Sequence, residues 1–140
     1  MQQFLDNTCN ELNKVWDNRY TEIENLYEQF QMAARMTFNI FGKDAFHKFK
    51  AGNYENKINR AVADIMLFYF SNPDIRMAVP GHEEQIKSRF EILSTGRAEF
   101  LSAIETTTKS IQSVKERFNT WANALNEELG VKVESPYSEN

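Results

Sequence analysis

Residues Asn56 to Ser71 read NKINRAVADIMLFYFS, and this stretch decides the fold. One face carries apolar residues at helical spacing, namely Ile58, Val62, Ile65 and Tyr69. The remaining faces carry Ala61, Met66, Phe68 and Phe70. A helix that is apolar on nearly all sides belongs at the centre of a domain. A β-strand over the apolar run from Ile65 to Phe70 is the alternative, but the helical spacing of apolar residues continues back to Asn56. Asn72-Pro73 ends the helix, because a residue before proline is pushed out of the α region.

The N-terminal part of the chain predicts one long amphipathic helix from about Leu5 towards Phe41. Its apolar residues are spaced three or four apart, with one interruption at Arg19: Leu5, Cys9, Leu12, Trp16, Ile23, Leu26, Phe30 and Ala33. Gly42 is placed to end this helix, because glycine favours the C-terminal cap. At about 1.5 Å per residue the helix would be roughly 50 Å long, which is more than a small core covers. We therefore expect part of it to pack on something else.

Further helices are expected on the C-terminal side of the Pro80-Gly81 turn. Their ranges are Glu83 to Leu93, Arg97 to Glu105, and the hydroxyl-rich run at Thr106 up to Gly130. The sequence thus predicts an all-α fold, a bundle of five or six helices with a long N-terminal helix. Residues 1–130 would form a single helical domain, and the polar residues 131–140 a flexible tail.

Composition narrows the class of protein. A chain of 140 residues with 41% hydrophobic and 26% charged residues suits one globular domain. The single cysteine allows no internal disulfide, which points to a reducing compartment and so to the cytoplasm. The first residues lack the pattern of a signal peptide. The longest apolar run, Ile65 to Phe70, is far shorter than the roughly 20 residues of a membrane span, so no membrane contact is expected.

Charge is unevenly distributed along the chain. The net charge of -4 makes no global case for nucleic-acid binding. Residues 4–30 are acidic, whereas residues 43–60 carry a basic cluster of Lys43, Lys48, Lys50, Lys57 and Arg60. Aromatic residues among these cations could stack on bases. The three-residue spacing of Phe46 and Phe49 instead favours core anchors, and we favour a contact between domains or subunits over nucleic acid for the lysines.

No catalytic motif stands out. The sequence contains no glycine-rich phosphate loop, no paired Cys-x-x-Cys, no His-Glu-x-x-His and no nucleophile elbow. Neither His47 nor His82 has a cysteine or carboxylate cluster beside it, so no metal site is expected. Glu83 and Glu84 are adjacent on a helix and point about 100° apart, so they suit the helix dipole better than acid–base chemistry. Cys9 falls in the apolar stripe, which favours a buried thiol. The sequence therefore predicts no catalytic residue, metal or cofactor.

A run of short motifs resembles a known family. It begins with Phe41-Gly42 and Ala45-Phe46 followed by basic residues, and continues with the helix start at Asn56 to Ala61. The helix pair over Ile86 to Phe100 comes next, followed by a polar turn and a closing Val114-x-x-Arg117-Phe118 helix. Over roughly Phe30 to Leu129 the chain is similar to the helical C-terminal region of the ParB-like, nucleotide-dependent subunits of GmrSD-type modification-dependent restriction systems.

The resemblance implies an architectural role for the shared residues. Phe41, Phe46 and Phe118 would be core anchors, and Arg117 would hydrogen-bond exposed carbonyls or an acidic partner. The family's nucleotide chemistry resides in an N-terminal mixed α/β region with an Asp-Gly-Gln-Gln-Arg type motif, which this chain does not contain. His47 also stands where the family more often has arginine. The resemblance therefore does not imply that this chain hydrolyses nucleotides.

Three functions remain open. The leading one is a noncatalytic helical module of such an antiphage defence subunit, which binds a protein partner or itself through residues that include Leu5, Leu12, Trp16, Ile23, Leu26 and Arg117. The second is nucleic-acid binding through the basic cluster. The third is a split or truncated piece of a restriction enzyme that is active only with its missing half.

Overall fold

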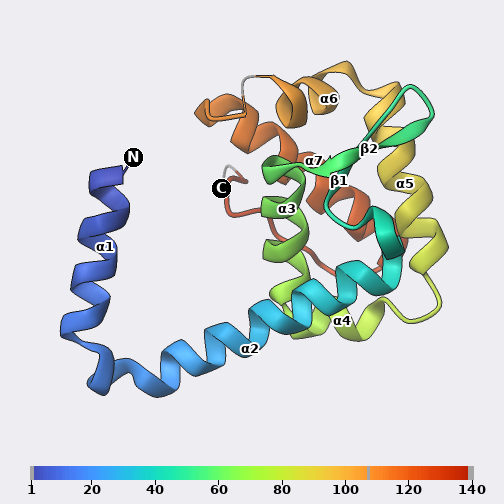
Figure 1. Ribbon diagram of the computed structural model, residues 1–140. Helices are drawn as coiled ribbons and strands as arrows, with labels where there is room; N and C mark the ends of the chain where they lie inside the picture. Colours follow the sequence, from blue (N-terminus) through green and yellow to red (C-terminus); the bar gives the residue numbers. More distant parts are fainter. Residues whose placement is uncertain (1, 107, 139–140) are drawn as a thin grey trace.

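The computed structural model describes residues 2–106 and 108–138, which are mainly helical (Figure 1). This part of the chain holds seven α-helices and a two-stranded antiparallel sheet. In order these are α1 (Gln2–Lys14), α2 (Trp16–Phe41), β1 (His47–Lys50), β2 (Asn53–Ile58), α3 (Arg60–Ser71), α4 (Pro73–Ala78), α5 (Glu83–Gly96), α6 (Ala98–Glu105) and α7 (Ile111–Leu129), with the 3-10 turn η1 (Gly42–Asp44) after α2. The helical class is confirmed, but the fold is not purely all-α and it has more helices than the expected five or six.

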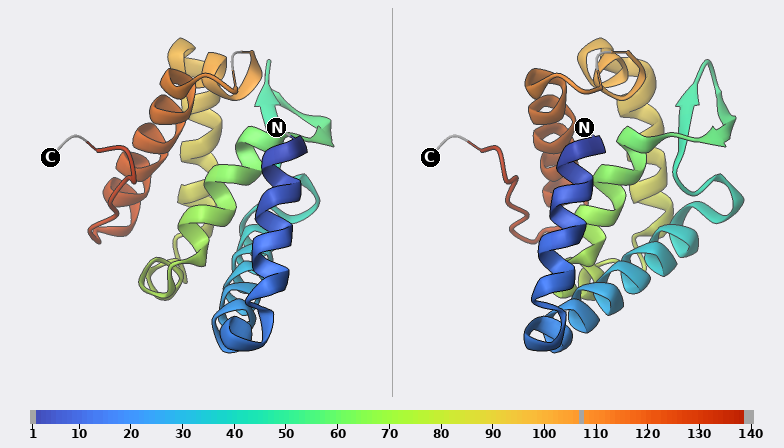
Figure 2. Two further views of the ribbon diagram at one scale, coloured as in Figure 1. Left: turned by 90° about the vertical axis from the view of Figure 1, so that its left-hand side faces the viewer. Right: turned by 60° about the vertical axis from the view of Figure 1, so that its left-hand side comes forward.

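α3 lies at the centre of the fold, as its composition predicts. It contacts α2, α4, α6, α7 and β1, and the views in Figure 2 show it between α2 and α7. Ile65 and Phe70 are completely buried. The helix begins at Arg60 rather than at Asn56, because the Asn59 side chain caps it by accepting a 3.0 Å hydrogen bond from the Val62 N–H.

The β-hairpin replaces helix in the segment before α3. His47 pairs with Ile58 and Phe49 with Tyr54, with a register shift between His47 and Phe49. Gly52 in the connecting turn has φ of 84°, a conformation that glycine adopts without steric cost. The ring of Phe49 packs edge-on against that of Tyr54, with 4.9 Å between the centroids. Phe49 therefore packs from a strand, and Phe46 packs from the turn before it, where its φ is 65°; neither packs from a helix.

The expected N-terminal helix is two helices. The chain bends at Val15, whose φ and ψ of -110° and 11° lie outside the helical region, and α2 begins at Trp16. The carbonyl of Val15 accepts hydrogen bonds from the N–H groups of Asn18 and Arg19 at 3.1 and 3.0 Å, so it serves as the first acceptor of α2. α2 ends at Phe41, and Gly42 has a positive φ of 58°, which confirms the predicted stop.

The C-terminal helices follow the predicted order with small changes of boundary. α5 extends to Gly96, and α7 begins at Ile111 after Ser110, whose hydroxyl accepts a 3.1 Å hydrogen bond from the Ser113 N–H. Gly130 ends α7 in the left-handed conformation with φ of 64°. The core that these helices enclose with α3 includes Phe90, Phe100, Ile104, Trp121 and Leu125.

The segment after Gly130 contacts α7. Val133 is buried, and its backbone exchanges hydrogen bonds of 2.6 and 2.8 Å with the Asn126 side-chain amide. The ring of Tyr137 packs edge-on against that of Phe118, with 5.4 Å between the centroids. Residues 131–138, which we expected to form a flexible tail, therefore contribute side chains to the edge of the core.

Candidate protein-binding arm and basic cluster

All of α1 and about two thirds of α2 project from the rest of the fold. We call residues 2–32 the arm and the remainder the body. In Figure 1, α1 stands apart from the body and is joined to it through α2. α2 has 26 residues and α3 has 12, so their lengths are about 39 and 18 Å at 1.5 Å per residue. α2 is thus too long for its main partner to cover.

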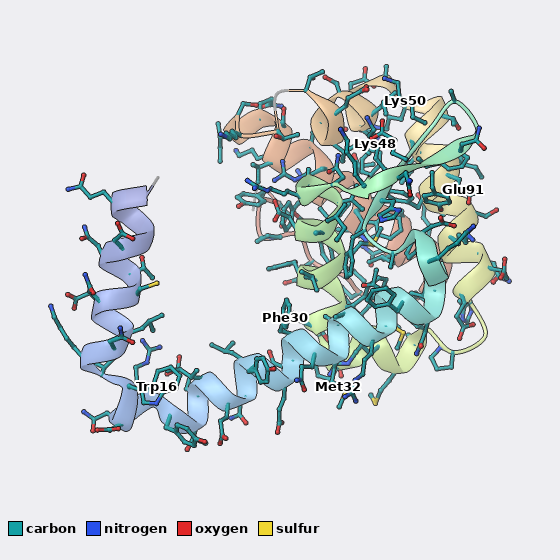
Figure 3. The ribbon with its side chains drawn as sticks, viewed as in Figure 1. Trp16, Phe30, Met32, Lys48, Lys50 and Glu91 are labelled. Atoms are coloured by element: carbon teal, nitrogen blue, oxygen red, sulfur yellow. The ribbon has the colours of Figure 1, made fainter. Side chains whose placement is uncertain are left out.

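The apolar face of α2 continues into the arm, where the described residues supply no partner for it. Its buried residues on the body, Ala33, Thr37 and Ile40, are spaced four and three apart. The same series runs outward through Phe30, Leu26, Ile23 and Trp16, and we call these four residues the arm seam. Leu26, Phe30 and Trp16 are 57%, 51% and 43% exposed, respectively. Figure 3 shows Trp16 beside the bend and Phe30 where α2 reaches the body.

Further apolar residues enlarge this surface. Tyr20 and Tyr27 are also exposed, and they follow Trp16 and Ile23 by four residues each, on one side of the arm seam. The rings of Trp16 and Tyr20 pack edge-on with 6.3 Å between the centroids. Contiguous exposed aromatic residues on a helix are typical of a protein-binding surface.

The arm carries negative charge beside these apolar residues. Residues 2–32 contain six acidic and two basic residues, which leaves fourteen of each elsewhere, so the whole formal net charge of -4 resides on the arm. Asp17, Glu24 and Glu28 lie on one side of the helix at steps of seven and four. None of the three pairs with a cation in the described part of the chain. Glu24 accepts a 2.6 Å hydrogen bond from the Tyr20 hydroxyl, which raises the pKa of that phenol.

Among the described residues, two exposed ion pairs are internal to the arm, Lys14 with Glu11 on α1 and Arg19 with Glu22 on α2. The Arg19 guanidinium donates to the Glu22 carboxylate, with Nε 2.7 Å from Oε2. This hydrogen bond raises the pKa of Arg19 and lowers that of Glu22. Arg19 interrupts the apolar series at the position between Trp16 and Ile23, and its pairing with Glu22 satisfies the charge there.

The residues that we expected to bind a protein lie in three places. Trp16, Ile23 and Leu26 lie on the arm as expected, and Leu12 is half-buried near the bend. The side chain of Leu5 falls outside the described residues. Arg117 lies elsewhere, on α7.

Arg117 is buried inside the body. It donates hydrogen bonds of 2.8 Å to the Thr108 carbonyl and 2.9 Å to the Asp64 carboxylate of α3. Its predicted ability to bind carbonyls and an acidic group is therefore used within this chain, where it holds the start of α7 to α3.

Cys9 does not have the environment that its position in the apolar stripe predicts. It is an exposed free thiol on α1. The expectation of a buried thiol is wrong, because α1 stands apart from the body and leaves its apolar stripe exposed at Cys9.

The basic cluster is divided by the fold. Lys48 of β1 is only 5% exposed, and its ammonium contacts the carboxylates of Glu55 at 2.8 Å and Glu105 at 3.0 Å. Lys50 also pairs with Glu105, and Figure 3 shows both lysines on the hairpin. Burial opposes the charge of Lys48, but the two carboxylates prevail and raise its pKa. These two cations therefore stabilise the hairpin against α6 and are not free for a phosphate.

The other three cations of the cluster are exposed. Lys43, Lys57 and Arg60 have no anionic partner among the described residues. The Asn59 N–H donates a 2.9 Å hydrogen bond to the Phe46 carbonyl, which joins the two ends of the hairpin. Lys43 lies three residues from this bond on one side, and Lys57 and Arg60 lie within two residues of it on the other. We call these three cations the hairpin base, together with the exposed Ile58, which stands between Lys57 and Arg60 in the sequence.

The sequence did not reveal the partners of the buried lysine. Glu55 lies within the basic segment itself, and Glu105 comes from α6, fifty-seven residues from Lys48. A second cross-link, a 3.0 Å hydrogen bond from the Tyr54 hydroxyl to the Glu91 carboxylate, holds β2 to α5. Burial and this bond raise the pKa of Tyr54. The turn signal at Gly52-Asn53 between apolar residues was the clue to the hairpin.

The described residues contain neither a metal-binding cluster nor a membrane-spanning helix. Nowhere in residues 2–106 and 108–138 do three His, Cys, Asp or Glu side chains come together as a metal site requires. No helix of that part of the chain is long and apolar enough to cross a membrane.

The fold and the exposed surfaces thus define a helical domain with a projecting acidic arm. Comparisons with protein-family models, with curated proteins and with solved structures find no match to the chain.

Proposed function

We propose that this protein is a noncatalytic assembly module that binds a protein through its arm. The observation that carries the proposal is the arm seam, which continues the buried face of α2 but has no partner in the described part of the chain. Exposed apolar surface of this kind is stabilised when another protein covers it, at roughly 25 cal/mol per Å² of apolar area removed from water. Leu26 and Phe30 are the two most exposed residues of the arm seam, which makes them the expected anchors of the contact.

A comparison of three variants with the wild type tests this proposal. We expect Leu26→Glu and Phe30→Glu to abolish binding, because each places a charge in an apolar interface. Ile92→Glu is the matched control, since Ile92 is 58% exposed on α5, away from the arm. Size-exclusion chromatography with light scattering measures self-association, and pull-downs measure capture of other proteins. A wild-type chain that stays monomeric and captures nothing that depends on Leu26 or Phe30 would contradict the proposal.

We also propose that the module is similar in role to the helical C-terminal region of a ParB-like restriction subunit. Its support is architectural, because Phe41 and Phe118 are buried and Gly42 ends α2. An adjacent reading frame that encodes the missing nucleotide motif would support this part of the proposal. A neighbourhood without any defence gene would count against it. Nucleic-acid binding has less support, since two of the five cations are held by carboxylates of this chain.

A further inference from the structure

We infer that the partner of the arm is a second copy of this chain. In the dimer that we propose, the arm of each copy packs across the hairpin base of the other, so the two contacts are equivalent and related by a two-fold axis. This inference rests on the proposed function, because it names the protein that covers the arm seam.

Charge complementarity between two surfaces of the same chain is the first argument. On the arm, Asp17, Glu24 and Glu28 form an acidic row that lacks cationic partners among the described residues. At about 100° per residue, this row lies on the side of α2 next to Tyr20 and Tyr27. The hairpin base carries three cations that have no anionic partner among the described residues, and it also carries Ile58, which is 66% exposed. Each surface thus has an apolar part and three charges, and the charges have opposite sign. Such complementarity favours one docking arrangement over others.

The exposed area of the chain provides the second argument. The chain exposes 9069 Å², whereas a compact monomer of 16.4 kDa exposes about 7,500 Å² by the usual scaling with mass. The excess is about 1,500 Å², and each partner contributes only about 800 Å² to a protein interface of standard size. The chain therefore has enough surplus surface for two reciprocal contacts. When each copy docks its arm on the other, the assembly is closed. If only one arm docked, the second arm would remain free to bind a further copy and extend a fibre.

A complementary charge swap tests the inference. One variant carries Asp17→Lys, Glu24→Lys and Glu28→Lys, and a second carries Lys43→Glu, Lys57→Glu and Arg60→Glu. Alone, each variant brings like charges together in both contacts, so we expect self-association about tenfold or more weaker than that of the wild type. In an equimolar mixture, both contacts pair opposite charges again. We therefore expect the mixture to form heterodimers with an affinity near that of the wild type.

The measurement is the mass from sedimentation equilibrium at low ionic strength, where exposed charges are least screened. Lys109→Glu and Glu99→Lys, exposed charges outside both surfaces, serve as controls that should dimerise like the wild type. Circular dichroism checks that each variant is folded. Wild-type dimerisation that survives reversal of the hairpin base, or a mixture that stays monomeric, overturns the inference.

The outcomes also separate this inference from the proposed function. A dimer that is lost with Leu26→Glu but unaffected by the hairpin-base variant leaves an assembly module with a different docking surface. A monomeric chain that captures another protein through Leu26 retains the proposed function and refutes the second copy as the partner. A monomeric chain with no partner that depends on Leu26 refutes both.

Discussion

Lys48 has a different role in the structure from the one that its place in the sequence suggests. In the sequence it is one of five cations that could bind a phosphate. In the fold it is buried, and two carboxylates of the same chain hold it. A buried lysine that lost these partners would retain an uncompensated charge, which is strongly destabilising. The role of Lys48 is therefore to fix the hairpin against α6.

Glu105 should make the stability of this contact depend on pH. Hydrogen bonds from Lys50 and Lys48 lower its pKa in the folded chain below the ordinary value of 4.5. A carboxylate whose pKa is lower when folded stabilises the fold above its unfolded pKa, and this contribution disappears as the pH falls through the folded pKa. We expect Glu105→Gln to lower the melting temperature at pH 7, and the difference from the wild type to shrink below pH 4.5. Thermal denaturation followed by circular dichroism measures both.

Glu99→Gln is the matched control for this effect. Glu99 lies on the same helix but is exposed, and it has no ion-pair partner among the described residues. Its melting temperature should follow that of the wild type at each pH. A Glu105→Gln variant with the same deficit at pH 7 and at pH 3 would show that the loss does not come from the charge on Glu105.

At the scale of elements, the sequence predicts the helices better than it predicts the segment between them. The dense apolar pattern of α3 and the glycines after α2 and α7 are local signals, so those features are confirmed. The bend at Val15 has no glycine or proline to mark it, so the N-terminal helix could not be divided from the sequence. The hairpin was missed because its contacts to Glu91 and Glu105 come from distant helices, which override the local helical spacing of Phe46 and Phe49.

The turn of the hairpin offers a test at this scale. Gly52 has a positive φ of 84°, so Gly52→Ala should lower the free energy of unfolding by roughly 1–2 kcal/mol. Ala51 also has a positive φ, 51°, so Ala51→Gly should relieve strain and raise that free energy by a smaller amount. Urea denaturation measures both changes. Equal effects of the two substitutions, or a stabilised Gly52→Ala variant, would contradict this conformation of the turn.

For the whole molecule, the sequence predicted an overlong apolar helix in need of a partner, and the structure leaves its outer half exposed. The residues of the candidate site on α2 were found because their spacing is regular. The hairpin base could not be found in this way, because it depends on which lysines the distant Glu105 neutralises. The account of the assembly therefore combines a surface visible in the sequence with one that only the fold creates.

The fluorescence of Trp16 tests the central claim, that a second copy covers the arm, most directly. Trp16 is 43% exposed on the arm seam, whereas Trp121 is completely buried and provides a constant background. The difference in emission between the wild type and Trp16→Phe isolates the arm. We predict that this difference shifts to shorter wavelength as the concentration rises through the range in which the mass doubles. Emission typical of an exposed tryptophan that does not change while the mass doubles would contradict the claim.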